Sequence, residues 1–218
     1  MNFFQTIIGA QKPLKLSPRD AEGIEDGLLW ALGCLDGLTS SPVRVWLAAH
    51  QGAFDTLPAL APAPAIWERL GLNAPLRPQN APAENSLTAD PSLPRAALEV
   101  GQRLIELSGK RVPLWWADSW KPAHMLALIL GLGRVFTARA IDQLPTDQSF
   151  CLLSDNETGY ALALIAEFSG HEPKAALRAL DAKVLEGFAS GRSHLSRDLD
   201  LRNDLHALTT GYDRAKVR

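Results

Sequence analysis

A cysteine followed by a polar turn and a helix start is the part of this sequence whose residue types and spacing could most directly do chemistry. Residues 149–153 are a short apolar run that predicts a buried strand, and this run contains Cys151. Residues 154–157 read Ser-Asp-Asn-Glu, and Thr158 and Gly159 then open an apolar helix. A thiolate beside the N-terminus of a helix is a nucleophile suited to an anionic substrate.

Residues 149–180 resemble the dual-specificity branch of the cysteine phosphatases, whose signature is a strand, then HCxxGxxR, then Ser or Thr with Gly at the start of a helix. Cys151 falls at the nucleophile position and Thr158 at the hydroxyl position. Asp118, 33 residues before Cys151, stands where the family has its acid loop. The resemblance implies an enzyme, or an inactive relative of one, with its site around Asp118, Cys151 and the turn 154–157.

The same segment departs from the family at three positions. Phe150 replaces the histidine, Ser154 replaces the loop glycine, and Glu157 replaces the arginine that grips the phosphate as a bidentate cation. Residues 154–157 also fit a capping box, in which the Ser154 hydroxyl accepts from the N–H of Glu157 and the Glu157 carboxylate reaches back to the N–H of Ser154. Under this second interpretation Cys151 is a buried core thiol.

Half of the six tryptophans lie within residues 115–120, Trp-Trp-Ala-Asp-Ser-Trp. Residues 111–116 predict a strand, which would place Trp115 and Trp116 on opposite faces. Asp118 and Trp120 would then lie in the loop at its carboxyl end, the side where open α/β sheets bind ligands. The alternative is that these large apolar residues close the core.

The residues predicted to bind a ligand or partner come from this loop and from the polar turn. They are Trp116, Asp118, Trp120, Ser154 and Asn156. The function favoured by the sequence is therefore a non-catalytic intracellular α/β protein that binds a protein partner or small ligand, with a homo-oligomer left open. The phosphatase-like enzyme or inactive relative is the alternative.

Other common catalytic patterns are missing from the sequence. It contains no GxxxxGK[ST], GxGxxG or SxxK, and no histidine pair at HxxxH or HxH spacing. We therefore expect no cofactor and no metal. His124 falls on an apolar helix and is expected to be a core residue with its hydrogen bonds satisfied.

Charge and cysteine content limit which partners and which cellular compartment are expected. The 22 basic and 24 acidic side chains of the 218 residues give a net charge of -2, which disfavours a nucleic-acid partner. The two cysteines, Cys34 and Cys151, suit a reducing cytoplasm. The most apolar stretches, 125–132 and 160–166, are far shorter than the roughly 20 residues of a membrane span. A cytoplasmic protein without a membrane span is expected.

Three regions are predicted along the chain. Residues 1–56 hold a helix that begins at Pro18 after the cap Ser17 and a strand at 43–47. An apolar stripe runs along that helix at Ile24, Leu28, Leu32 and Leu35. Residues 57–95 hold 8 of the 15 prolines and predict a surface loop or linker, with a partner-binding arm as the alternative.

Residues 96–218 are predicted to be the core region. Strands are expected at 111–116, 134–141 and 149–153. Helices are expected at 94–108, 122–132, 158–169, from Pro173 through Phe188, and from about 195 to 208. Strands that alternate with helices predict an α/β fold, with a layered, buried sheet, flanking helices and a helical C-terminal part.

Overall fold

The structure of the protein is a computed structural model, and it describes residues 13–36, 92–132, 136, 144, 152–169 and 180–214. These residues form six α-helices and one 3₁₀ helix, without a strand. The elements are α2 (Pro18–Asp36), α5 (Ser92–Ser108), η3 (Leu114–Trp116), α6 (Lys121–Ile129), α9 (Asp155–Ser169), α11 (Ala182–Leu195) and α12 (Leu199–Arg214).

The predicted α/β fold with a layered, buried sheet is wrong for the described residues, which are helical. The expected strand at 111–116 is instead a loop leading into η3. The N–H of Trp116 donates to the carbonyl of Pro113 at 2.9 Å, and that of Ala117 to Leu114 at 3.3 Å. Since these donors are used within the turn and Pro113 has none, the segment cannot form a sheet ladder.

The other predicted strands fall mostly outside the described residues. That is true of 43–47, of 134–141 apart from Phe136, and of 149–151. Leu152 and Leu153 are described; both are buried, and neither belongs to a strand. These short apolar runs are long enough for a strand but carry no feature that separates a strand from a buried irregular segment.

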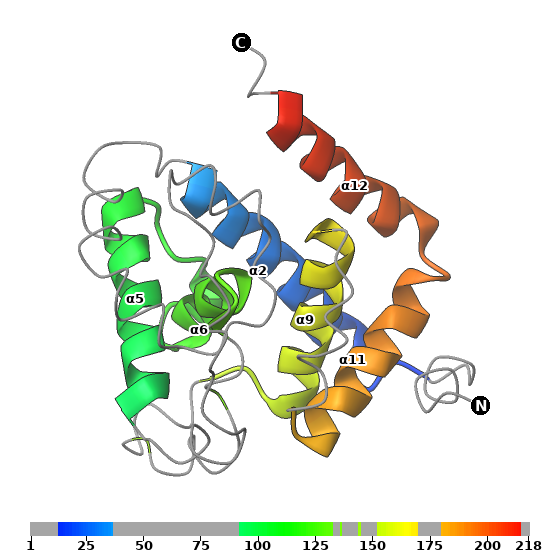
Figure 1. Ribbon diagram of the computed structural model, residues 1–218, viewed down its shortest axis with the longest axis horizontal. Coiled ribbons are helices and arrows are strands. Elements are labelled where there is room, and N and C mark those ends of the chain that lie inside the picture. The colour runs from blue at the N-terminus through cyan, green and yellow to red at the C-terminus, as the bar shows by residue number, and fades with distance from the viewer. Residues whose placement is uncertain are drawn as a thin grey trace, which may run out of the picture.

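Helix α2 crosses the middle of the molecule, with α5 and α6 on one side of it and α9 with α11 on the other (Figure 1). It contacts α5, α6 and α9, while α11 packs along α9 and α12 contacts both α9 and α11. The core therefore lies between α2 and the helices around it. None of the described helices combines the length and hydropathy that spanning a bilayer requires.

The prediction for α2 is confirmed. The helix begins at Pro18, and the Ser17 hydroxyl accepts from the N–H of Asp20 at 3.2 Å and donates to its carboxylate at 2.6 Å. These bonds occupy one of the N–H groups that a helix start leaves without a partner. The predicted apolar stripe is buried at all four positions, Ile24, Leu28, Leu32 and Leu35.

The predicted helices α5, α6 and α9 are also confirmed, with small changes at their ends. Helix α5 begins at Ser92, inside the predicted linker 57–95, whose residues before 92 lie outside the described part. Gly109 follows α5 with φ 63°, a left-handed conformation that terminates a helix. Residues 122–129 of α6 are buried on all sides, as its uniform apolar composition predicted.

Helices α9 and α11 approach each other at backbone distance because Gly159 has no side chain. A Cβ on Gly159 would overlap the carbonyl oxygen of Val184. Gly187 on α11 is similarly close to Asn156, where a Cβ would lie 2.8 Å from the backbone oxygen. The glycine that matches the phosphatase signature is thus a packing residue between two helices.

The helix predicted from Pro173 through Phe188 is not continuous, because Leu180 and Asp181 are not helical and α11 runs from Ala182 through Leu195. Residues 173–179 lie outside the described part, so the start of the predicted helix is not tested. The final helix α12 begins at Leu199, after a turn in which the Asp198 carboxylate accepts from the N–H of Leu201 at 3.0 Å. Asp198 therefore caps α12, and this capping residue explains why the helix begins there rather than near 195.

Candidate functional site

The tryptophan-rich segment is fixed to α2 at two points. The Trp30 indole N–H donates to the carbonyl of Arg111 at 3.0 Å. The Trp116 ring packs directly on Gly27, where a Cβ would lie within 2.6 Å of Cζ2. The segment before α6 is thus held against the helix by one hydrogen bond and one ring contact.

Adjacent residues of η3 have opposite environments. Trp116 is 4% exposed and belongs to the core, whereas Trp115 is 60% exposed and Leu114 is 92% exposed. Successive side chains of a 3₁₀ helix point about 120° apart, so only one of the three faces α2. Two large apolar side chains remain on the surface as a consequence.

Trp115 and Trp116 border a hollow of about 460 Å³, which we name the tryptophan groove. It lies between the first turns of α2, η3, and the starts of α6 and α9. Its lining residues are Arg19, Asp20, Glu22, Gly23, Ile24, Asp26, Trp115, Trp116, Lys121 and Glu157.

The tryptophan groove carries an excess of negative charge. Four carboxylates line it against one arginine and one lysine. The lysine is neutralised locally, because Lys121 Nζ lies 2.7 Å from Glu157 Oε1 and both side chains are mostly buried. Glu22 and Asp26 are exposed on α2 and form no ion pair with a described residue. Two uncompensated carboxylates therefore stand beside the exposed face of Trp115.

The turn 154–157 forms the predicted capping box. The N–H of Ser154 donates to Glu157 Oε2 at 2.7 Å, and the N–H of Glu157 donates to Ser154 Oγ at 3.4 Å. The N–H of Thr158 donates to the Ser154 carbonyl at 2.7 Å. These amide groups are used within the chain, and the Glu157 carboxylate occupies the helix start where a phosphate-binding loop would hold its anion.

The predicted loop residues are divided among different environments. Trp116 lines the tryptophan groove from the core side. Asp118 is exposed in the turn before α6, and Trp120 is half-buried against the core; neither lines the groove. Besides Trp116, the residues of this segment that line the groove are Trp115 and Lys121.

The predicted turn residues are used by α9 itself. Ser154 is exposed and caps the helix, and the backbone of Asn156 faces Gly187 of α11. Cys151 lies outside the described residues. The structure does bring the turn and the tryptophan segment together, through the ion pair of Lys121 with Glu157.

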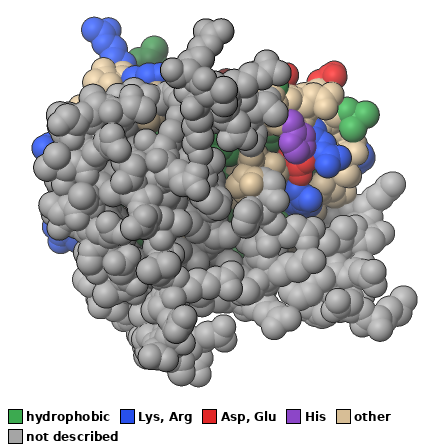
Figure 2. Space-filling model, turned by 45° about the horizontal axis from the view of Figure 1, so that its top comes forward, with side chains coloured by type: hydrophobic (Ala, Val, Ile, Leu, Met, Phe, Trp, Pro, Cys, Tyr) green, Lys and Arg blue, Asp and Glu red, His purple; other side chains and the backbone are tan. Residues whose placement is uncertain are grey.

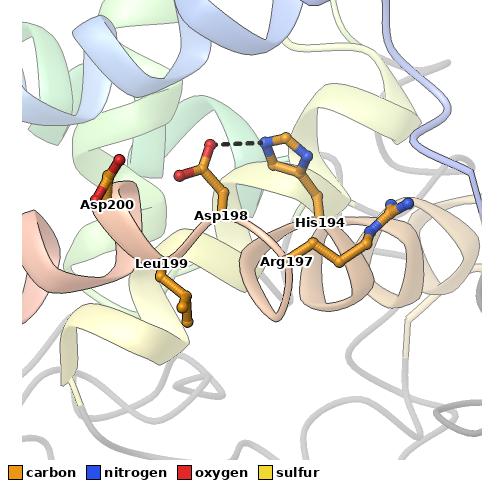
Figure 3. Close-up of a pocket in the computed structure, with 5 residues that line it drawn as sticks. All are labelled: His194, Arg197, Asp198, Leu199 and Asp200. Carbon is orange, nitrogen blue, oxygen red and sulfur yellow. Dashed lines mark ion pairs between the residues drawn. The ribbon is translucent and has the colours of Figure 1, made fainter.

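A second hollow, about 590 Å³, lies at the turn between α11 and α12. Figure 3 shows the His194 ring and the Asp198 carboxylate facing each other, with Arg197 extending away from them. His194 Nε2 lies 3.9 Å from Asp198 Oδ2, an ion-pair distance that is too long for a hydrogen bond. Leu199 and Asp200 complete the lining. The lining thus contains a base but no hydroxyl or thiol nucleophile.

Behind His194, a buried tyrosine connects α9 to α2. The Tyr160 hydroxyl donates to Glu25 Oε1, and the edge of the Tyr160 ring packs against His194 with 6.0 Å between the ring centroids. Burial raises the pKa of the Glu25 carboxyl, although the bond from Tyr160 lowers it. Burial and the neighbouring Glu25 raise the pKa of Tyr160. The Glu25 carboxylate thus gives the buried Tyr160 hydroxyl a hydrogen-bond acceptor within the core.

Two further reactive side chains are sealed in the core. His124 is fully buried, and its ring is tilted by 44° to that of Phe136 with 4.1 Å between the centroids. Neither of its ring nitrogens has a hydrogen-bond partner among the described residues. Its core position was predicted correctly, but the predicted hydrogen bonds are not found there. Burial lowers the pKa of His124 to about 3. Burial also raises the pKa of the Cys34 thiol.

The described residues contain no cluster of three or more histidine, cysteine or acidic side chains that could hold a metal ion. Comparisons with protein families, with curated proteins and with solved structures found no match to this chain. The two hollows and their side chains are therefore the candidate binding surfaces of the described residues.

Sequence reasoning missed the α2 side of the tryptophan groove. Glu22 and Asp26 lie four residues apart and thus on one face of the helix, opposite the buried stripe. That spacing was visible in the sequence. What was not visible is that Trp115 and Trp116, some 90 positions later, line the same hollow as these carboxylates.

Proposed function

We propose that the protein acts by binding a protein partner through the tryptophan groove, and that the bound segment presents a lysine or arginine side chain. The observation that carries this proposal is the exposed ring of Trp115 beside the unpaired carboxylates of Glu22 and Asp26. A cytoplasmic location is part of the proposal, since two widely separated cysteines suit a reducing compartment.

An aromatic face next to carboxylates favours a cation. A guanidinium or ammonium over a tryptophan ring gains about 0.5–2 kcal/mol, and the nearby carboxylates add a directed ion pair. The apolar neighbour Leu114 extends the contact surface beyond the charge. Tryptophan is also a residue type that often dominates the binding energy of protein interfaces. These features support a basic segment over an acidic one.

The phosphatase-like alternative finds no support in the described residues. The helix start at residues 154–158 already holds the Glu157 carboxylate, which would repel a phosphate dianion. Asp118 is exposed and does not line the tryptophan groove. A binding role accounts for the exposed apolar residues, which an enzyme site elsewhere would leave unexplained.

Binding of immobilised short peptides tests the proposal. We expect the wild-type chain to prefer peptides that carry lysine or arginine, and this preference to weaken as salt is added. Trp115→Ala and the double variant Glu22→Gln/Asp26→Asn should each reduce binding by about 2- to 30-fold, since each removes a contact worth about 0.5–2 kcal/mol. Leu199→Ala is the matched control, because Leu199 is equally exposed and lies outside the groove.

All these positions are on the surface, so the variants should retain the wild-type melting temperature within about 2–4 °C. Circular dichroism checks this before any binding is compared. The proposal fails if Trp115→Ala binds the same peptides as the wild type, or if acidic peptides are preferred.

A further inference from the structure

A single buried carboxylate on α9 meets three basic side chains from the C-terminal helices. Glu167 is buried, and its Oε2 accepts from Arg192 of α11. Its Oε1 accepts from Arg202 Nε at 2.6 Å and lies 3.1 Å from His206 Nε2, both on α12. The side chains join three helices at one point, two residues before the end of α9.

The charges at this point do not balance. Burial alone would raise the pKa of Glu167, but the hydrogen bond from Arg202 and the charge of Arg192 hold that pKa below its ordinary value. Glu167 is therefore ionised and supplies one negative charge against two permanent positive charges. The surplus from the two arginines is one positive charge, and the His206 ring lies beside it.

The two arginines keep unused donors at the surface. Each guanidinium has five N–H groups, and each one reaches Glu167 through a single nitrogen. The side chains of Arg192 and Arg202 are 30% and 46% exposed, and His206 is half exposed. Figure 2 shows basic, acidic and histidine side chains gathered on the described part of one face. An approaching anion thus finds open N–H groups that Glu167 already holds in position.

We propose that Arg192, Arg202 and His206 form a binding site for a phosphate group, with Glu167 as the positioning residue. A phosphate monoester carries between one and a half and two negative charges at neutral pH, so the surplus positive charge attracts it. Its three oxygens suit two planar guanidiniums, which favour forked hydrogen bonds. Asp198 is engaged, since it caps α12 and pairs with His194. The acids next to Arg202 in sequence, Asp200 and Asp204, are exposed and form no ion pair with Arg192 or Arg202.

This site is separate from the tryptophan groove in residues and in charge. It draws on α11 and α12, whereas the groove draws on α2, η3, α6 and α9. Because the phosphate would contact both α11 and α12, its binding should stabilise the contact of α12 with the rest of the protein.

Titration of the full chain with inorganic phosphate, at constant ionic strength maintained with chloride, tests the site. We expect saturable binding by calorimetry and a rise in melting temperature. Arg202→Gln should weaken the affinity about tenfold, the loss of one charge-assisted pair. Arg103→Gln is the matched control. Arg103 is about as exposed as Arg202 and is likewise paired with a glutamate, but that glutamate lies on the same helix, α5. It should bind phosphate like the wild type.

Glu167→Gln distinguishes a binding site from a purely structural ion cluster. The glutamine keeps one carbonyl oxygen that can accept from the arginines but lacks the negative charge that opposes an anion. Phosphate binding should therefore strengthen, whereas a structural cluster would only lose stability. Arg202→Lys retains the charge and should bind phosphate with an affinity between those of the wild type and Arg202→Gln. This variant tests the site even if Glu167→Gln fails to fold. Binding of glycerol phosphate would indicate a soluble ligand, whereas binding only to vesicles that contain phosphatidic acid would indicate a lipid headgroup. Absence of saturable phosphate binding in the wild type overturns the proposal, as does equal weakening by Arg202→Gln and Arg103→Gln.

Discussion

Two glycines one turn apart on α2 should respond in opposite ways to the same substitution. Gly27 lies under the Trp116 ring, and a Cβ there would come within 2.6 Å of Cζ2 and closer still to Cη2. Gly23 has nothing within 4 Å of the corresponding position. Alanine at either site adds one methyl group to the same helix, so the pair isolates the effect of the tryptophan contact.

The magnitudes follow from two competing effects. Replacing glycine with alanine inside a helix stabilises it by about 0.5–1 kcal/mol, because the unfolded chain loses freedom. Gly23→Ala should show that gain in the free energy of unfolding. Gly27→Ala makes the same gain but forces the buried Trp116 ring away from α2, which costs about 1–3 kcal/mol. The difference between the two variants should therefore be about 1–3 kcal/mol in favour of Gly23→Ala.

Urea unfolding followed by circular dichroism measures both free energies. A third comparison locates the cause: in a Trp116→Leu background the ring is absent, and Gly27→Ala should then stabilise the chain as Gly23→Ala does. Equal stability of the two alanine variants in the wild-type background would refute the reasoning. So would a loss in Gly27→Ala that persists unchanged after Trp116 is replaced.

Three further outcomes are expected. Ser154→Ala should lower the free energy of unfolding by about 1 kcal/mol in urea, because it removes the α9 cap, while Ser196→Ala in an exposed turn should change it little. The unfolded chain protonates His124 near pH 6.5 but the folded chain only near pH 3, so the wild type should lose about 2 kcal/mol of stability between pH 7.5 and 5 through this residue. His124→Leu should be correspondingly less sensitive over that interval, and identical pH profiles would contradict the burial of a neutral imidazole. In a Cys151→Ser background, Cys34 should resist alkylation at neutral pH until the chain unfolds, and rapid modification of the native protein would show that it is accessible.

The helices could be predicted because their signals are local. Ser17 and Pro18 marked the start of α2, and the apolar stripe from Ile24 to Leu35 marked its buried face. The Ser154 to Glu157 capping box was likewise readable from four consecutive residues. Such features depend on contacts within one or two turns of chain, which the sequence contains in full.

The sheet was predicted wrongly because a short apolar run has no distinctive period. The segment ending at Trp116 is as apolar as a strand, yet Pro113 and the i→i+3 bonds make it a turn. The tryptophan groove depends on the packing of Trp116 on Gly27, a contact between residues 89 positions apart. No local pattern specifies such a contact, so Trp115 could be recognised as unusual but not placed beside Glu22.

Glu157 divides its two carboxylate oxygens between different tasks: Oε1 pairs with Lys121 at the rim of the tryptophan groove, and Oε2 accepts from the N–H of Ser154. One rigid planar group therefore connects the wall of the groove to the first turn of a different helix. A partner that displaces the lysine must rotate that plane and change the length of the bond to the amide. The amide proton of Ser154 would then act as a built-in spectroscopic reporter, its chemical shift recording the occupancy of a surface that the serine itself does not line.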